Sequence, residues 1–170
     1  ERRLNQAEQA VDCYEQVLER EPSHRHARDA LERLIEVPSQ RQRCARLLAP
    51  IYEDRGDWPE LVETLQVQLE DVGNVPDRVA LLTRIAGLQE DRLHDPPAAF
   101  ASIATAVEVD PAEQLVREEL ARLARMRDAE RERAGVLERA IAVAGEDRAL
   151  VCELLLEVAQ LWDDAVGDPD

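Results

Sequence analysis

Three histidines are the first residues in the chain that could bind a metal or move a proton. His24 and His26 stand two positions apart at an expected helix start. On a helix, residues two apart point about 200° away from each other, so these imidazoles are poor joint ligands. His94 falls in an expected turn. We therefore expect surface and turn roles for the histidines, and no metal site.

Acidic pairs could supply the two carboxylates of general acid–base catalysis. They occur as Glu53-Asp54, Glu90-Asp91 and Asp163-Asp164, each near the end of a helical pattern and just before a turn. Such catalysis needs a cleft that shifts a carboxyl pKa, whereas recurrence at equivalent places favours a solvated, structural role. No G-x-S-x-G, H-E-x-x-H or phosphate-binding loop is present. The sequence predicts a protein that is not an enzyme and has no cofactor.

Cysteine and lysine usage narrows the chemistry further. Cys13, Cys44 and Cys152 are far apart and none belongs to a C-x-x-C pair, so they form neither a zinc site nor a disulfide framework. We interpret them as small apolar helix residues in a reducing compartment. All 21 basic residues are Arg, which excludes a Schiff-base or P-loop lysine and indicates coding in a GC-rich, bacterial-type genome.

The acidic balance of the chain excludes two classes of partner. The formal net charge is −16, which repels nucleic-acid phosphates and anionic membrane surfaces. No apolar run reaches the length of about 18 residues that a membrane span needs, and no leader pattern is present. We expect a cytoplasmic protein that binds neither nucleic acid nor membrane.

Apolar residues recur with helical spacing along the whole chain, and aromatic residues make up only 3% of it. The pattern predicts nine helices, at about 5–20, 23–36, 39–54, 57–72, 75–92, 95–108, 111–126, 128–144 and 146–165. Ser23 is the expected N-cap of the second helix, and Gly145 the expected C-cap of the eighth. Because the loops between them are short, neighbouring helices should run antiparallel in an all-α fold.

The turns between these helices repeat. Dipeptides that end in Asp recur before expected helices, at Gly56-Asp57, His94-Asp95, Arg127-Asp128 and Gly167-Asp168. The Asp residues are 38, 33 and 40 positions apart, and a period of about 20–50 residues is typical of a solenoid. The segment at about 37–50, flanked by Pro38 and Pro50, should hold an extra helix or a shifted register, and Pro50 should kink its helix.

Two segments resemble the second helix of a tetratricopeptide repeat. Residues 8–22 carry a small residue, an aromatic and a proline at the spacing of that family, in Ala10, Tyr14 and Pro22, and residues 99–111 are similar, with Ala99, Ala106 and Pro111. Tyr52 and Trp162 match the family's large aromatic before the inter-helix turn. The resemblance implies a right-handed α-solenoid of antiparallel helix pairs, an irregular array of the tetratricopeptide type. Since Pro-kinked helices also occur in HEAT repeats, another irregular α-solenoid is the alternative.

In the tetratricopeptide family, the first helices of the repeats line a concave groove that binds a peptide or helix of a partner protein. By repeat position, the resemblance implies that this groove includes Asp29, Arg33, Arg46, Thr83, Gly87, Glu118, Arg122, Leu156 and Gln160. The chain has no Lys for the clamp that holds a C-terminal carboxylate in some members. We therefore expect a protein–protein interaction scaffold of another specificity. The alternative is a structural spacer or self-assembly segment of a larger repeat protein.

The pattern also predicts one repeat domain over residues 1–170, cut from a longer array. It starts on a second-type helix and stops where another should begin. The terminal helices carry more apolar residues than one stripe needs, such as Val17 and Leu156. Because a solenoid needs polar caps at its ends, we expect end-to-end association between copies of the chain.

Overall fold

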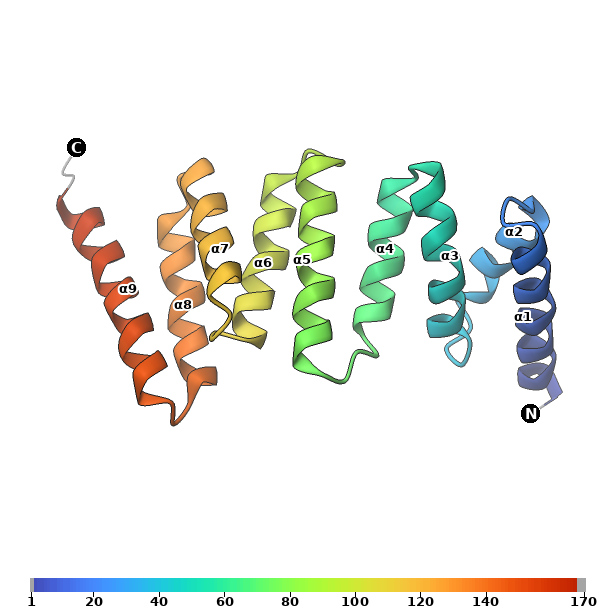
Figure 1. The fold of residues 1–170 in the computed structure, drawn as a ribbon, viewed down its shortest axis with the longest axis horizontal. Helices are drawn as coiled ribbons and strands as arrows, with labels where there is room; N and C mark the ends of the chain where they lie inside the picture. Colours follow the sequence, from blue (N-terminus) through green and yellow to red (C-terminus); the bar gives the residue numbers. More distant parts are fainter. Residues whose placement is uncertain (1, 168–170) are drawn as a thin grey trace. The chain divides into compact units, whose positions relative to one another are not determined.

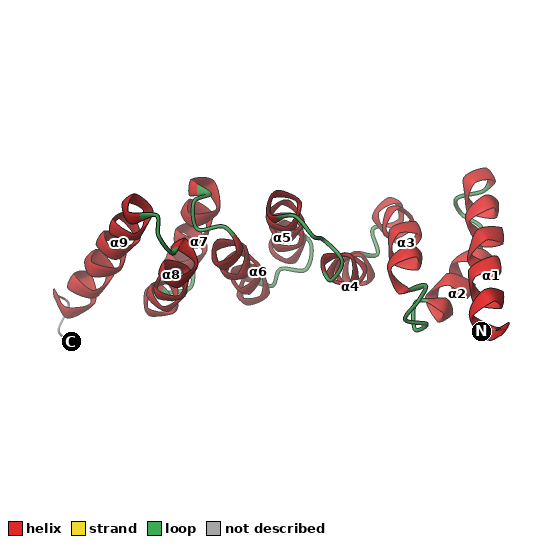
Figure 2. Cartoon of the chain, turned by 90° about the horizontal axis from the view of Figure 1, so that it is seen from below, coloured by secondary structure: helices red, strands yellow, loops and turns green. Residues whose placement is uncertain are grey.

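The computed structural model describes residues 2–167, with side chains from residue 6 to residue 163. Within that range every regular element is an α-helix and there is no strand (Figures 1 and 2). The helices are α1 (Arg2–Arg20), α2 (Arg25–Leu34), α3 (Arg41–Arg55), α4 (Trp58–Leu69), α5 (Val75–Asp91), α6 (Pro96–Val109), α7 (Gln114–Met126), α8 (Glu130–Ala144) and α9 (Arg148–Gly167). They confirm the all-α prediction, and the expected helix ends lie within three residues of the observed ones. None of the described helices has the length and apolar character of a bilayer span.

The chain divides into two compact units, Glu1–Val72 and Gly73–Asp170. Unit 1 holds α1 to α4 and unit 2 holds α5 to α9. Within each unit, successive helices pack on one another and the short connections turn the chain back (Figure 1). Each unit therefore has the stacked helix pairs of an α-solenoid. The prediction of one domain cut from a longer array stays a prediction.

Unit 1 is built around α3, which contacts both α2 and α4. Cys44, Ala45 and Leu48 of α3 are at most 1% exposed. Leu31 of α2 and Leu61 of α4 are fully buried as well. These residues recur at helical spacing on their own helices, so each helix places one apolar stripe in a shared core.

Polar side chains fix the position of α3 against its neighbours. The Gln42 amide donates to the Val67 carbonyl oxygen at 2.6 Å, and the Gln68 amide donates to the Ala45 carbonyl oxygen at 3.0 Å. Both bonds join α3 to α4. On the other side, the Arg43 guanidinium pairs with Asp12 and Glu15 of α1, so α3 is held from two directions.

The start of α2 differs from the prediction. The backbone N–H of His24 donates to the Glu21 carbonyl oxygen at 3.0 Å, which places Ser23 inside a turn. His24 is therefore the N-cap, and its Nδ1 accepts from the Ala27 N–H at 3.2 Å. The expectation for Ser23 was wrong because the turn after Pro22 needs one more residue before the helix begins.

The segment around the expected register break is a run of turns followed by a helix. Turns at 35–40 follow the short α2, and backbone bonds from Val37 to Leu34 and from Gln40 to Val37 close them. Pro50 lies within α3, where its missing N–H leaves one backbone acceptor without its usual donor. The register break at 37–50 and a kink at Pro50 stay predictions.

The core of unit 2 contains alanine beside larger apolar side chains. Ala99 and Ala106 of α6 are fully buried, as are Leu137 and Ala140 of α8. The helix α6 contacts α8 as well as its chain neighbours α5 and α7. Small side chains let helix axes approach, which explains why the alanines of the repeat pattern lie at this junction.

Two of the repeated turns have the expected form, and the third is shifted. Gly56 and His94 take left-handed backbone with φ of 73° and 53°, and the Asp after each is the N-cap of the next helix. In the third turn Asp128 itself takes φ of 52°, so the N-cap is Ala129. Asp128 fills the left-handed position that Gly56 and His94 take in the other two turns. Gly145 is the C-cap of α8, as expected, with φ of 57°.

The fourth expected turn, Gly167-Asp168-Pro169, does not begin within the described chain. Gly167 is still the last residue of α9. Asp168 and Pro169 lie outside the described residues.

Candidate functional site

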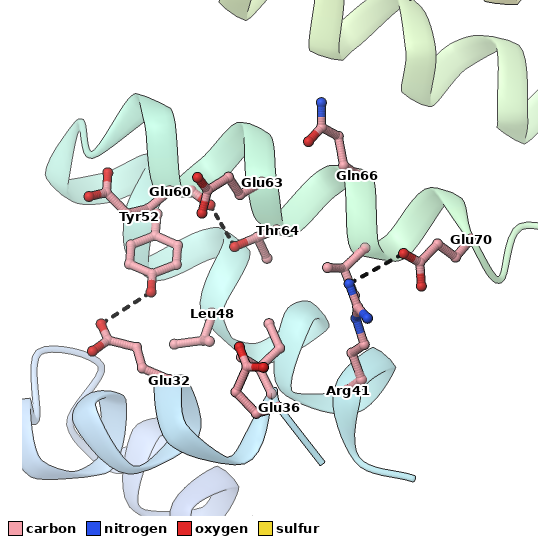
Figure 3. Close-up of a pocket in the computed structure, with 12 residues that line it drawn as sticks. Glu32, Glu36, Arg41, Leu48, Tyr52, Glu60, Glu63, Thr64, Gln66 and Glu70 are labelled. Carbon is pink, nitrogen blue, oxygen red and sulfur yellow. Dashed lines mark hydrogen bonds and ion pairs between the residues drawn. The ribbon is translucent and has the colours of Figure 1, made fainter. Parts of the chain in front are cut away.

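Unit 1 contains a groove of about 510 Å³ that lies over α3 between α2 and α4. We call it the unit 1 groove. Its lining residues come from these three helices and the residues that follow them: Glu32, Ile35, Glu36, Arg41, Leu48, Tyr52, Glu60, Glu63, Thr64, Gln66, Val67 and Glu70. Figure 3 shows these side chains gathered around Leu48 and Tyr52. The volume lies in the range of about 300–1,000 Å³ that ligand-binding sites occupy.

The floor of the groove is largely apolar, and its buried hydroxyls are hydrogen-bonded within the chain. Leu48 and Tyr52 of α3 are 1% and 7% exposed, and Thr64 of α4 is 3% exposed. The Thr64 hydroxyl donates its hydrogen to the Glu60 carbonyl oxygen at 2.6 Å, so this hydrogen is not free to bind a ligand. Ile35 and Val67 stand half-buried beside this floor. The groove therefore offers apolar surface at its base.

Tyr52 closes one end of the groove. Its hydroxyl donates to the Glu32 carboxylate at 3.1 Å (Figure 3). Burial raises the pKa of the Tyr52 phenol, and the negative charge of Glu32 raises it further. The phenol is therefore neutral at physiological pH and acts as a hydrogen-bond donor that joins α3 to α2.

The walls of the groove are acidic. Glu32 and Glu36 come from α2 and the turn after it, and Glu60, Glu63 and Glu70 come from α4 and its C-cap. Arg41 is the single cationic lining residue, and it pairs with Glu70 at 3.3 Å (Figure 3).

Three of these carboxylates have no side-chain partner. Among the side chains that the structure describes, Glu36, Glu60 and Glu63 form no ion pair or side-chain hydrogen bond. All three are exposed. The groove thus combines an apolar base with unneutralised negative charge on two opposite walls.

The groove is lined by carboxylates, one guanidinium, one amide, two hydroxyls and apolar side chains. The groove holds no cysteine or histidine, and its one threonine hydroxyl is already bonded to the backbone. In the described part of the chain no cluster of three or more His, Cys, Asp or Glu could hold a metal ion. These residues can give a ligand hydrophobic contact at the base of the groove and charge-assisted hydrogen bonds at its walls.

A second, smaller cavity of about 250 Å³ lies in unit 2 among α7, α8 and α9. Arg117 is its most buried charged residue at 5% exposed, and it pairs with Glu153 at 2.5 Å and Glu157 at 3.8 Å. Arg133 pairs with Glu157 at 3.2 Å. The charges at this site neutralise one another and hold α9 against α7 and α8.

The nine residues assigned to a groove by repeat position lie elsewhere. None of them lines the unit 1 groove, and Glu118 alone lines the smaller cavity of unit 2. There Glu118 accepts from its own helix neighbour Gln114 at 2.8 Å. Arg33, Gln160 and Leu156 are exposed, with Leu156 at 65%. These placements leave the binding role of the nine residues a prediction.

Several of the nine are already engaged within the chain. Arg122 of α7 donates to Glu90 of α5, with Nη1 to Oε1 at 2.9 Å, and to Glu119 at 2.8 Å. Hydrogen bonds to Glu119 and Glu90 raise the pKa of Arg122, and the bond from Arg122 lowers the pKa of Glu119. Arg122 therefore has its guanidinium committed to the α5–α7 contact.

The remaining members of that set make local contacts. Arg46 pairs with Asp71 at 3.1 Å, and Asp29 pairs with Arg28 at 2.8 Å. The Thr83 hydroxyl donates to the Val79 carbonyl oxygen at 2.9 Å, within α5. Gly87 is half-buried on the same helix.

The residues of the unit 1 groove carried a signal that sequence reasoning passed over. Glu32 and Glu36 are four apart, and Glu60, Glu63, Val67 and Glu70 follow one helical face. Two acidic stripes on alternate helices can form facing walls once an apolar helix lies between them. That last condition depends on tertiary packing.

Comparisons with known proteins give no family for the chain. No protein-family model matches it, and no curated protein matches it. Among solved structures, it is similar to a putative kinesin light chain of Podosopora anserina with nearly identical TPR-like repeats, at 17% identity and a TM-score of 0.40, over 98% of this chain and 97% of that chain.

Proposed function

We propose that this chain is a protein–protein interaction scaffold of the tetratricopeptide type, which binds a peptide or helix of a partner protein and carries out no catalysis. The unit 1 groove is the observation that supports this proposal. It is open, it has an apolar base, and its size suits a ligand. Helical repeat proteins use such surfaces for peptide recognition, in which apolar anchors enter a groove between helices.

The engaged side chains of the groove favour a rigid receptor. Arg41–Glu70 and Tyr52–Glu32 hold its two ends, and the bonds of Gln42 hold α3 against α4. A preformed groove loses little conformational entropy when a peptide enters it. More of the free energy gained from the apolar contact then contributes to the binding affinity.

A selection experiment tests the binding function without assuming the charge of the partner. Peptides selected from a random display library on the immobilised chain are measured against the wild type and against Gln66→Trp, which replaces a lining residue of the groove with a bulky neutral one. Gln66 is exposed and has no side-chain hydrogen bond among the described residues. We expect binding to fall at least tenfold.

The matched control is Gln16→Trp on α1, an exposed glutamine outside the groove. Circular dichroism confirms that both variants keep their helices. Selected peptides that bind Gln66→Trp as well as they bind Gln16→Trp would place the binding surface elsewhere and refute the role of the groove.

A specific observation favours self-assembly as a second candidate function. Leu155, Leu156 and Trp162 of α9 are 51%, 65% and 42% exposed. Leu155 and Trp162 are seven residues apart and share a face. Among the described side chains, α1 contributes no exposed large apolar residue, so α9 is the surface to which we assign contact with a second copy.

Sedimentation velocity over a range of protein concentrations tests this second function. We expect the wild type to associate and Leu155→Glu, which places a charge on the face shared with Trp162, to remain a monomer. A wild type that stays monomeric at the highest concentration excludes the self-assembly function, and it leaves the unit 1 groove unaffected.

A further inference from the structure

We propose that the occupant of the unit 1 groove is a cationic segment of a partner protein, with arginine or lysine side chains on both sides of an apolar anchor. This inference rests on the proposed binding function and adds the chemistry of the ligand. The unpaired carboxylates Glu36, Glu60 and Glu63, together with the buried Leu48 below them, carry it.

The position of the free charges sets the requirement on the ligand. Glu36 belongs to the α2 wall and Glu63 to the α4 wall, with Leu48 of α3 at the base (Figure 3). An apolar side chain placed on Leu48 therefore lies between carboxylates on two sides. A ligand that carries cations on one edge only would leave the other wall unneutralised.

The groove has no unpaired cationic side chain among its lining residues. Arg41, its only basic lining residue, is paired with Glu70 at 3.3 Å. The carboxylate of Glu32 already accepts from the Tyr52 hydroxyl. Glu36, Glu60 and Glu63 thus keep their negative charge available for a cationic ligand.

An acidic segment is excluded by the same charges. Like charges brought together at a binding surface weaken the wrong complex and so give specificity. The net charge of −16 extends this preference to the encounter, because the whole chain attracts cationic ligands at low ionic strength. Binding to the groove should therefore weaken as salt is raised.

The apolar base distinguishes a protein segment from a small polycation. Half-buried Ile35 and Val67, beside the buried Leu48, offer surface that apolar groups can use. Arginine and lysine also lay their methylene stems along such surface while the charged end reaches a carboxylate. A polyamine supplies the charge and lacks the anchor, so it should bind more weakly than the segment.

A set of three labelled helical peptides tests the inference by fluorescence anisotropy. The peptides share the same leucine anchors and differ only in their flanking residues, which are all Lys, all Gln or all Glu. We expect the Lys peptide to bind the wild type most tightly, the Gln peptide to bind at least tenfold more weakly, and the Glu peptide to show no binding. Added salt should reduce the difference between the Lys and Gln peptides.

Charge-neutralising variants locate the effect. The double variant Glu60→Gln/Glu63→Gln should weaken the Lys peptide about three- to tenfold, because exposed ion pairs contribute modestly. The control Glu19→Gln/Glu21→Gln removes the same charge from exposed sites outside the groove and should change affinity less than twofold. An equal loss in the control would show that net charge alone attracts the peptide and would overturn the inference.

The remaining outcomes separate the two proposals. If the Lys and Gln peptides bind equally, and Gln66→Trp blocks both, the groove is a binding site and the cationic preference is wrong. If no peptide binds, or if spermidine competes as well as the Lys peptide on a molar basis, the proposed cationic segment is excluded. If Gln66→Trp does not affect binding of the Lys peptide, the unit 1 groove is not the binding site and both proposals for it are wrong.

Discussion

Cys44 should make the stability of unit 1 fall at alkaline pH. The thiol lies on α3 in the core of unit 1 and is fully buried. Burial raises its pKa from the ordinary 9.0 to about 11, and the neighbouring Arg43 charge offsets a small part of that rise. The folded chain therefore keeps the Cys44 proton at a pH where the unfolded chain loses it.

The sign and size of the effect follow from this difference. Unfolding releases a proton between about pH 9 and pH 11, so the free energy of unfolding decreases as pH rises through that window. Below pH 9 the Cys44 thiol is protonated in both the folded and the unfolded chain, so the full stability is retained there. At pH 10 the loss amounts to about 1.4 kcal/mol relative to neutral pH, and it approaches about 3 kcal/mol above pH 11.

The composition of the chain makes this measurement clean. All 21 basic residues are Arg, so no lysine ammonium titrates in the window where Cys44 loses its proton. Trp58 reports on unit 1, because Trp162 is the other tryptophan and can be replaced by Phe. Urea unfolding of Trp162→Phe, followed by Trp58 fluorescence between pH 7 and pH 10, should show the decrease.

Cys44→Ala provides the control, because it removes the thiol and keeps a small apolar side chain. We expect it to be less stable than the parent at neutral pH and to lose most of the decrease between pH 8 and pH 10. If Cys44→Ala shows the same decrease as its parent, the effect comes from other groups. The reasoning from burial would then be refuted.

The helices were predictable because each one repeats its apolar residues on one face. Val79, Leu82 and Ile85 recur at helical spacing along α5, and all three are buried. The N-caps were less predictable, because they depend on which residue takes left-handed backbone. Asp128 fills that position itself, where Gly56 does so in the first turn, and the sequence pattern of the two turns does not reveal the difference.

The candidate site required information that the sequence alone does not carry. The resemblance to tetratricopeptide repeats assigned groove residues by register, and it selected Arg122 and Arg46. In the structure these guanidiniums pair with Glu90 and Asp71, which lie on other helices or just after them. Which acid faces which arginine depends on helix packing, and so does the juxtaposition of acidic walls whose members lie far apart in the sequence, such as Glu32 and Glu60.

Three further substitutions test the packing of unit 2. His94→Gly should stabilise the chain by about 0.5–1 kcal/mol, because glycine takes the left-handed backbone at φ of 53° without strain, while its greater chain entropy offsets part of the gain. Thermal unfolding measures the change, and a loss of stability would contradict the assigned strain. Leu154→Ala should cost about 2–5 kcal/mol in urea unfolding, whereas Leu156→Ala should cost less than about 0.5 kcal/mol, because the two side chains are 0% and 65% exposed; equal costs would contradict the orientation of α9. Arg122→Gln should lose the ion pair with Glu90 that joins α7 to α5 and the pair with Glu119 within α7. Since the Arg122 side chain is 40% exposed, solvent screening limits the cost to about 1 kcal/mol. Arg125→Gln removes the same charge from an exposed position of α7 and is the control. The difference between these two variants should shrink at high salt, because added ions screen the pairs of Arg122; a difference that does not depend on salt would mean that Arg122 stabilises unit 2 through its methylene stem rather than through its charge.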